Sequence, residues 1–318
     1  MVDEVFFGWS VMWEDEGSGL RFGRIMGIGG WMERNLIEEK SREWMEEREK
    51  AGNTYVVTRG FADVMRGARV QARMLETLGR GCFVEKMEET ENGYCRVKLA
   101  NEISGFVPEV ALRKRLDSDR FLWGKSEERF FVEQGIPEGW SEEKFRRKVV
   151  ECAKGYLGCQ YRWGGKAADG IDCSGVVFMV YLMNGVLIWR DADIREGYPM
   201  KAIWREGEEM CLVEERAKAG DLLFWRGHVG MYLGDGRYLH CTGHERVFGC
   251  RVNSLRRGDE DFRKDLAEAL KVLGVFFREI SGSGKRSYDT VRRFSDESYY
   301  GGLQLSEADE RHAGPRVR

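Results

Sequence analysis

Apolar and polar residues alternate along this chain in two ways, and each predicts a different kind of element. In the first part, short apolar runs broken by glycines and charged residues predict β-strands at Trp9–Trp13 and Leu20–Ile28. The segment Leu36–Lys50 is dense in Glu, Arg and Lys, and it predicts a surface helix or a linker. The strand pattern then returns over residues 53–115, so we expect this part of the chain to be mainly β-structure.

The second stretch of strands carries a faint repeat of the first. Gly105-Phe106-Val107-Pro108 echoes Gly30-Trp31-Met32, and an aliphatic residue follows seven positions after each glycine, at Ile37 and Leu112. Asn92-Gly93 is a turn signal between two of the strands. The echo predicts two small β-barrels in tandem. The strands expected in the second barrel are Thr54–Thr58, Cys82–Met87 and Tyr94–Leu99.

Helical and strand patterns are clearest over residues 141–280. Ser141-Glu142-Glu143-Lys144 predicts a helix start with Ser141 as the N-cap. The apolar run Val176–Met183 predicts a buried helix. We expect the first of these helices to bury one face, made of Phe145, Val149, Cys152, Tyr156 and Leu157.

These patterns predict an α+β protein with several segments. A Ser-Gly-Ser-Gly stretch followed by mixed charges with few aliphatic residues predicts a disordered tail at the end. The expected segments are a short first β-barrel module at 1–50, a second module at 51–116, a linker at 117–140, the main domain at 141–280 and the tail at 281–318.

The composition limits the classes of binding partner and of site that we expect for this protein. The 318 residues include 51 Lys and Arg against 54 Asp and Glu, so the balanced charge leaves no basic footprint for nucleic acid. No apolar run approaches the ~20 residues of a membrane span, so none is expected. The acidic start Met1-Val2-Asp3-Glu4 is unlike a signal peptide, which predicts a cytoplasmic location for the sequence as it stands. The eight cysteines contain no C-x-x-C pair, so neither a disulfide framework nor a zinc site is expected.

One cysteine stands where a nucleophile is favoured. Cys173 follows a glycine-rich loop that contains Gly164-Gly165 and Gly170, and it begins the apolar helix. A helix N-terminus carries about +0.5 charge, which stabilises a thiolate and predicts a lowered pKa for this thiol. The other interpretation is that Cys173 is one more small buried residue.

Two histidines in neighbouring strands are candidate bases. His228 opens one predicted strand and His240 lies in the next, with Gly234-Asp235-Gly236 between the two strands. Because side chains alternate faces along a strand, a three-residue loop would put both histidines on one face, whereas a two-residue loop would separate them. A shared site therefore predicts the three-residue loop. His244 follows at a strand end, and we expect it to be peripheral.

With these residues the chain resembles the NlpC family of bacterial cell-wall cysteine peptidases, which have a papain-like fold. The resemblance covers about residues 141–280. It rests on five motifs in the family's order, which are Tyr161-x-Trp163-Gly164-Gly165, Asp172-Cys173-Ser174-Gly175, Ala219-Gly220-Asp221-Leu222-Leu223-Phe224, the run 227–236 and Tyr238-Leu239-His240. The N-terminal part is more loosely similar to the bacterial Src-homology-three-like modules of the YkfC-like branch, which Trp189-Arg190-Asp191-Ala192 also resembles.

The resemblance implies a role for each matching residue. Cys173 matches the nucleophile, His228 the general base, and His240 the residue that orients the first imidazole and fixes its tautomer. Tyr161 matches a tyrosine that helps to bind the oxyanion, beside the backbone N–H of Cys173. Trp163 is expected either to wall the cleft or to be a core aromatic residue. The implied mechanism is thiol attack, an acyl-enzyme and hydrolysis, with no metal or other cofactor.

The resemblance also implies a substrate contact and contains two departures. Asp172 and Ser174 match positions that hold the free amine of the substrate in the YkfC-like branch. Ala192 stands where relatives carry a serine near the site. The short first module offers Glu14 or Glu16 for the acidic contact that this module usually supplies, and it has no matching tyrosine.

The implied activity is that of an endopeptidase for murein stem peptides. It would cleave the bond between γ-D-glutamate and the following diamino acid in peptides with a free N-terminal L-Ala. Two alternatives stay open, an amidase or acyltransferase on the same scaffold and a non-catalytic cell-wall-binding protein. The expected partners are murein-derived peptides or peptidoglycan, and the protein is expected to be a monomer. An upstream signal peptide missing from this sequence would move the expected location to the cell wall or outside the cell.

Overall fold

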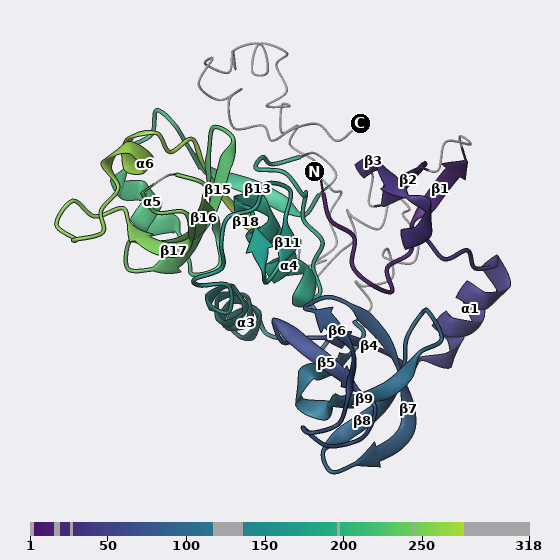
Figure 1. Ribbon diagram of the computed structural model, residues 1–318. Helices are drawn as coiled ribbons and strands as arrows, with labels where there is room; N and C mark the ends of the chain where they lie inside the picture. The colour runs from purple at the N-terminus through teal and green to yellow at the C-terminus, as the bar shows by residue number, and fades with distance from the viewer. Residues whose placement is uncertain are drawn as a thin grey trace.

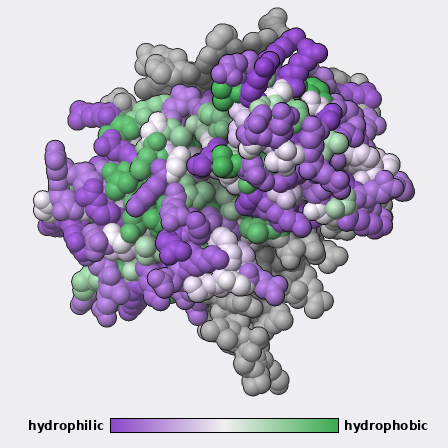
Figure 2. Space-filling view, turned by 90° about the horizontal axis from the view of Figure 1, so that it is seen from below, coloured by the Kyte–Doolittle hydropathy of each residue, from purple (hydrophilic) through white to green (hydrophobic). Residues whose placement is uncertain are grey.

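The computed structural model describes residues 3–15, 20–25, 28–116, 136–195, 198–244 and 246–276 of the chain (Figure 1). Most of the expected linker at 117–140 and the whole expected tail at 281–318 lie outside these residues, and the domain boundaries stay predictions. In Figure 1 a small sheet and a larger sheet precede a mixed α/β part, which carries the rest of the helices. Figure 2 shows hydrophilic residues over most of one face, with hydrophobic residues in smaller clusters between them.

The first sheet has three antiparallel strands, β1 (Met12–Asp15), β2 (Leu20–Ile25) and β3 (Ile28–Glu33). The single strand expected over Leu20–Ile28 is therefore wrong, because the chain turns back and its second half pairs with the first. The polar segment expected as a helix or linker contains helix α1 (Arg42–Ala51), whose N-cap Ser41 accepts a hydrogen bond from the Trp44 backbone N–H.

The second sheet has seven antiparallel strands in the order β10-β4-β7-β8-β9-β5-β6. The expected turn at Asn92-Gly93 joins β7 to β8, and both residues have the positive φ that a type I′ turn requires. The core of this sheet is aliphatic and includes Val57, Val84 and Val107. Its strands are β4 (Thr54–Val57), β5 (Phe61–Met65), β6 (Met74–Gly79), β7 (Phe83–Glu91), β8 (Tyr94–Lys98), β9 (Ser104–Pro108) and β10 (Leu112–Lys114).

The sequence echo between the two sheets corresponds to one repeated local structure. Strand β3 runs into the 3₁₀ helix η1 (Arg34–Leu36) and then extended Ile37, and β9 runs into η2 (Glu109–Ala111) and then extended Leu112. In both places the extended residue donates its N–H to the first carbonyl of the 3₁₀ turn. Neither sheet closes on itself by strand pairing among the described residues, so the barrel assignment stays a prediction.

The remaining part is an antiparallel six-stranded sheet in the order β13-β18-β14-β15-β16-β17, packed against helices. Helix α4 contacts both α3 and the strands β15 and β16. The strands are β13 (Met200–Arg205), β14 (Leu222–Trp225), β15 (His228–Gly234), β16 (Arg237–Thr242), β17 (Gly249–Ser254) and β18 (Val272–Phe276), with the two-residue pair β11 (Lys166–Ala167) and β12 (Gly170–Ile171). The helices are α3 (Glu142–Lys154), α4 (Cys173–Met183), α5 (Cys211–Arg216) and α6 (Lys264–Glu268).

The two helices expected in this part form as predicted, with one error. Ser141 caps α3 by accepting a hydrogen bond from the Lys144 backbone N–H, and every residue of α4 is buried. Within the predicted apolar face, Leu157 is 45% exposed. Helix α3 ends at Lys154, so the helical spacing no longer applies to this residue and its side chain leaves the buried face.

The N-terminal segment lies between the second sheet and α4. The Trp9 indole N–H donates to the carbonyl oxygen of Gly81 at 2.9 Å, and Trp9 belongs to the same buried cluster as α4. A Cβ on Gly81 would meet Met179 of α4 and Phe6 at once, so the three segments are in close contact here. The N-terminal residues are thus placed within reach of the residues around Cys173.

None of the helices in the described part of the chain combines the length and apolar character needed to cross a membrane. All eight cysteines of the sequence are described, and each is free.

Candidate active site

Cys173 is the first residue of α4, and the residue before it caps the helix. One carboxylate oxygen of Asp172 accepts the Gly175 N–H at 2.5 Å, and the other accepts the Gly164 N–H at 2.8 Å. A Cβ on Gly175 would clash with the carbonyl oxygen of Gly165. Only glycine at this position therefore lets the loop close over the first turn of the helix, which explains the glycines on both sides of the cysteine.

The surroundings of Cys173 favour the protonated form of its thiol. Its side chain is buried, and burial raises the pKa of the thiol to about 12, with the Asp172 carboxylate acting in the same direction. Hydrogen bonds from the backbone N–H groups of Val229 and Ser174 oppose this shift and are weaker. The expected lowering of the thiol pKa is therefore wrong, because loss of water around the sulfur outweighs the field of the helix N-terminus. A base must remove the proton before the sulfur can attack.

His228 and His240 meet as the shared-site hypothesis requires. The distance from His228 Nε2 to His240 Nδ1 is 2.8 Å. Strands β15 and β16 pair with Gly230 opposite His240 and Tyr232 opposite Tyr238, a register that places both imidazoles on one face of the sheet. Burial lowers the pKa of both rings, to about 3 for His228 and about 4 for His240, so both are neutral near pH 7.

The turn that produces this register differs from the expected three-residue loop. The turn is the two-residue Asp235-Gly236, with positive φ at both positions, and Gly234 pairs with Arg237 inside the ladder. A register shift between Tyr232 and Gly234 supplies the odd residue. The same-face register is confirmed, but a β-bulge beside a tight turn creates it.

Beyond His240 the hydrogen bonds continue to a residue of β17. His240 Nε2 lies 3.0 Å from Asn253 Oδ1, and Asn253 Nδ2 donates to the carbonyl oxygen of Asp261 at 2.8 Å. The side chains of His240 and Asn253 are 1% and 3% exposed. His244 is exposed after the end of β16, so its expected peripheral place is confirmed.

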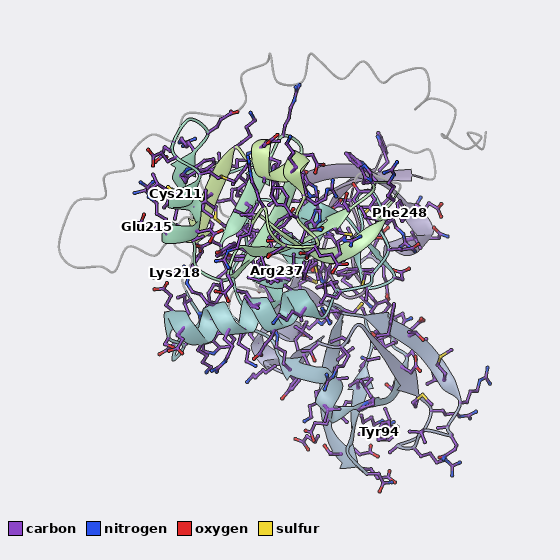
Figure 3. All side chains as sticks on the ribbon, turned by 90° about the vertical axis from the view of Figure 1, so that its left-hand side faces the viewer. Tyr94, Cys211, Glu215, Lys218, Arg237 and Phe248 are labelled. Atoms are coloured by element: carbon purple, nitrogen blue, oxygen red, sulfur yellow. The ribbon has the colours of Figure 1, made fainter. Side chains whose placement is uncertain are left out.

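One aromatic residue interacts with Cys173, and two others expected or found near it are exposed. Tyr161 lies close enough to Cys173 for the two groups to interact electrostatically, and burial raises the pKa of its phenol. Its ring contacts that of Phe248 edge-on, with 6.0 Å between centroids. Phe248 is 56% exposed at the edge of this part of the molecule, away from Cys211 and Lys218 (Figure 3). Trp163 is 72% exposed, so the interpretation of it as a core aromatic residue is wrong.

Asp172 and Ser174 are held by an arginine that lies after α4. Arg190 donates to both carboxylate oxygens of Asp172 at 3.1 Å and to the Ser174 hydroxyl at 2.7 Å. Its Nε donates to Asp3 at 2.8 Å, and Lys166 Nζ donates to the other oxygen of Asp3 at 2.8 Å. Burial lowers the pKa of Lys166 to about 8, and Asp3 opposes that shift.

Comparison with known proteins identifies the family of this chain. The model of the NlpC/P60 family matches residues 158–258, which contain the cysteine and both histidines. Dipeptidyl-peptidase 6 of Lysinibacillus sphaericus is 31% identical over 286 residues, which cover 87% of this chain and 92% of that protein. The chain belongs to the NlpC/P60 family. Its fold class is the expected one, an α+β protein with an NlpC-type domain.

Other NlpC/P60 proteins are similar over different lengths. The gamma-D-glutamyl-L-lysine dipeptidyl-peptidase of Bacillus subtilis is 36% identical over 119 residues, which cover 35% of this chain and 37% of that protein. A crystal structure of an NlpC/P60 family protein from Bacillus cereus superposes with a TM-score of 0.64 at 18% identity, covering 86% of this chain and 82% of that one. The superposition on the Bacillus cereus protein shows that the two proteins share a fold. The protein is accordingly an enzyme of a cysteine peptidase family whose members act on peptidoglycan.

Several residues around the candidate site have no local signal in the sequence. Asn253 sits in a strand with no motif around it, and Asp3 and Lys166 lie far apart along the chain. Arg190 lies within the segment that resembles the YkfC-like branch, which was the one available signal. Within the described ranges, no group of three or more His, Cys, Asp or Glu side chains is arranged to hold a metal ion.

Proposed function

We propose that this protein is a cysteine peptidase that hydrolyses murein stem peptides at the bond between γ-D-glutamate and the following diamino acid. The observation that carries the proposal is the contact between His228 and His240 on one face of the sheet, beside Cys173 at the start of α4. A buried thiol needs a neutral imidazole to ionise it, and the low pKa of His228 keeps that base neutral.

The proposed reaction begins with transfer of the thiol proton to His228 as the sulfur attacks the peptide carbonyl. The imidazolium then gives the proton to the leaving amine, and an acyl-enzyme remains on Cys173. Water, deprotonated by the same histidine, hydrolyses the thioester. The backbone N–H of Cys173 and the hydroxyl of Tyr161 are the proposed donors to the oxyanion.

The identity of the bond is supported by the relatives. Two similar proteins, from Bacillus subtilis and Bacillus cereus, are named gamma-D-glutamyl-L-lysine dipeptidyl-peptidases, and the relative that spans most of the chain is named a dipeptidyl-peptidase. An enzyme that removes a dipeptide must recognise the N-terminus of its substrate, because the cleaved bond follows the second residue. We therefore propose that a free N-terminal amine is part of what this site recognises.

Charge around Asp172 supports recognition of an amine. Asp191 interacts electrostatically with Asp3, Asp172, Arg190 and Arg195, and Lys166 interacts with Asp3, Glu4 and Arg190. A carboxylate immediately before the nucleophile would attract the ammonium group of a substrate. Asp172 and Ser174 remain the proposed contacts for the substrate amine. In the free protein both accept hydrogen bonds from Arg190. This preference suits small murein peptides more than intact cell wall.

The proposal is tested by digesting L-Ala-γ-D-Glu-L-Lys and its meso-diaminopimelate counterpart, each with a free and an acetylated N-terminus. We expect release of L-Ala-γ-D-Glu from the free peptides and little from the acetylated ones. The Cys173→Ala variant, which keeps the fold but not the sulfur, is the control and should release nothing. Release by that variant would overturn the peptidase, and equal cleavage of acetylated peptides would overturn amine recognition. Transfer of the dipeptide to an added amine in place of water would identify an acyltransferase.

A further inference from the structure

We infer that Asn253 is a positioning residue, which sets the tautomers of His240 and His228 so that the lone pair of His228 Nδ1 is available to the thiol of Cys173. The inference rests on the proposed function in one respect, that His228 acts on Cys173. Its structural basis is the hydrogen-bonded series from Asp261 through Asn253 and His240 to His228.

The orientation of the Asn253 amide follows from its partner in the loop after β17. The carbonyl oxygen of Asp261 is only an acceptor, so the Asn253 atom 2.8 Å away must be the Nδ2 donor. The reversed amide would place two acceptors in contact. The Oδ1 atom therefore faces His240 Nε2 at 3.0 Å, and an amide oxygen can only accept. His240 thus carries its proton on Nε2.

This assignment determines the proton positions in the next ring. His240 is neutral because burial lowers its pKa, so with a proton on Nε2 its Nδ1 holds a lone pair. The contact of 2.8 Å with His228 then requires an N–H on His228 Nε2. Neutral His228 has a lone pair on Nδ1, which is the atom that can accept a proton. Without Asn253, the opposite pair of tautomers would place a proton on His228 Nδ1 and remove the base.

The surroundings hold Asn253 in place. It lies opposite Tyr238 in the β16–β17 ladder, and Asp261, whose carbonyl it contacts, pairs with Arg237 of β16 at 2.7 Å. Its side chain is 3% exposed, so water does not replace the amide as a partner. The charged groups that interact with His240 are Arg263, Arg251 and Asp265, and Arg263 also interacts with His228.

The test compares the full-length protein with Asn253→Ala, Asn253→Asp and Ser254→Ala. Ser254 is the matched control, because it is the next residue of β17, is fully buried and bonds the same loop through Asp259, without touching an imidazole. Imidazole ¹⁵N shifts report which nitrogen of each ring carries a proton, and the chain has only four histidines to assign. Thermal unfolding and kcat and KM on the free tripeptide complete the measurement.

In the unmodified protein we expect His240 protonated on Nε2 and His228 on Nε2. Asn253→Ala should mix the tautomers and lower kcat about 10- to 100-fold with little change in KM, which is part of the contribution of a positioned base. Asn253→Asp keeps an acceptor for His240, so it should keep the tautomers and recover much of kcat. Its carboxylate also raises the pKa of the imidazoles, so the acid limb of its pH profile should move to higher pH. Ser254→Ala should lower stability and leave the tautomers unchanged.

Retention of the Nε2 proton on His240 in Asn253→Ala would overturn the inference. Equal losses of kcat in Asn253→Ala and Ser254→Ala would also overturn it, because both would then act through the loop alone. If Asn253→Ala does not fold, Asn253→Asp still decides, because loss of its tautomers contradicts the assignment. The nitrogen shifts come from the resting protein, so they stand even if no murein peptide is cleaved. Failure of the inference and failure of the proposed function are therefore separate results.

Discussion

Arg190 donates one hydrogen bond to each carboxylate oxygen of Asp172, both at 3.1 Å. This pair connects the loop after α4 to the residue that immediately precedes the nucleophile. The same carboxylate caps α4, so the guanidinium holds the cap and, through it, the first turn of the helix that carries Cys173. Arg190 also contacts Asp3, which connects the N-terminal segment to this pair.

Replacing Arg190 with methionine should destabilise the protein strongly. Loss of the guanidinium leaves Asp172 and Asp3 buried without their shared partner, and breaking such a buried pair costs about 3–5 kcal/mol in free energy of unfolding. Urea unfolding measures the change. The control is Arg256→Met, which removes a bidentate pair with Glu214 at the surface and should cost far less because water screens it. Equal costs for the two variants would contradict a structural role for the buried pair.

The Cys173 thiol should react slowly with iodoacetamide near neutral pH. Because burial raises its pKa to about 12, the thiolate fraction and the alkylation rate should rise roughly tenfold per pH unit between pH 6 and 9, without a plateau. The rate is followed by mass spectrometry in a Cys211→Ser background, which removes the exposed cysteine. A plateau beginning near pH 6 would show a preformed thiolate–imidazolium pair instead.

Stability should fall in acid because of the buried imidazoles. His240 has a pKa of about 4 when folded and about 6.5 when unfolded, so between these values the unfolded chain binds the extra proton. The contribution is fully present above pH 6.5 and declines by about 1.4 kcal/mol per pH unit as the pH falls toward 4. His228 acts in the same direction, down to about pH 3. Urea unfolding between pH 7 and 4 checks the slope, which should be smaller in His240→Asn and unchanged in His244→Asn.

Trp163 should contribute to substrate binding and not to stability. Its side chain is 72% exposed, so Trp163→Ala should change the free energy of unfolding by no more than about 0.5 kcal/mol. If it walls the cleft, loss of its apolar surface should raise KM about 3- to 10-fold. Val110→Ala, at a residue 74% exposed in the 3₁₀ helix η2, is the control and should leave KM unchanged. An unchanged KM in Trp163→Ala would exclude it from the cleft.

Removing the hydroxyl of Tyr161 should slow the chemical step. Tyr161→Phe keeps the edge-on contact with Phe248 but removes one proposed donor to the oxyanion, so kcat should fall about 100-fold while KM changes little. Single-turnover acylation of Cys173 separates this effect from later steps. Phe248→Leu disturbs the same aromatic contact without removing a donor, and a similar loss of kcat there would assign the effect to ring packing.

The residues named from the sequence are those that obey local rules. A glycine-rich loop and an apolar run predicted that Cys173 begins a buried helix, because helix starts depend on a few neighbouring residues. The parity of side chains along a strand left two registers open for His228 and His240, and the structure has the one in which they share a face. The bulge that creates this register could not be foreseen, because a two-residue turn with a bulge and a three-residue loop have the same glycines and the same count.

The tertiary structure determined the protonation of the site residues and the side chains that they contact. Asn253, Arg190 and Asp3 come from distant parts of the chain, and no local pattern places them beside the nucleophile and its base. The protonation of Cys173 also depended on the whole fold. The sequence by itself predicted the field of the helix N-terminus, whereas the loss of water around the sulfur came from packing against β15 and proved the larger effect. Local geometry depends on neighbouring residues, whereas desolvation and ion pairing arise only once the chain has folded.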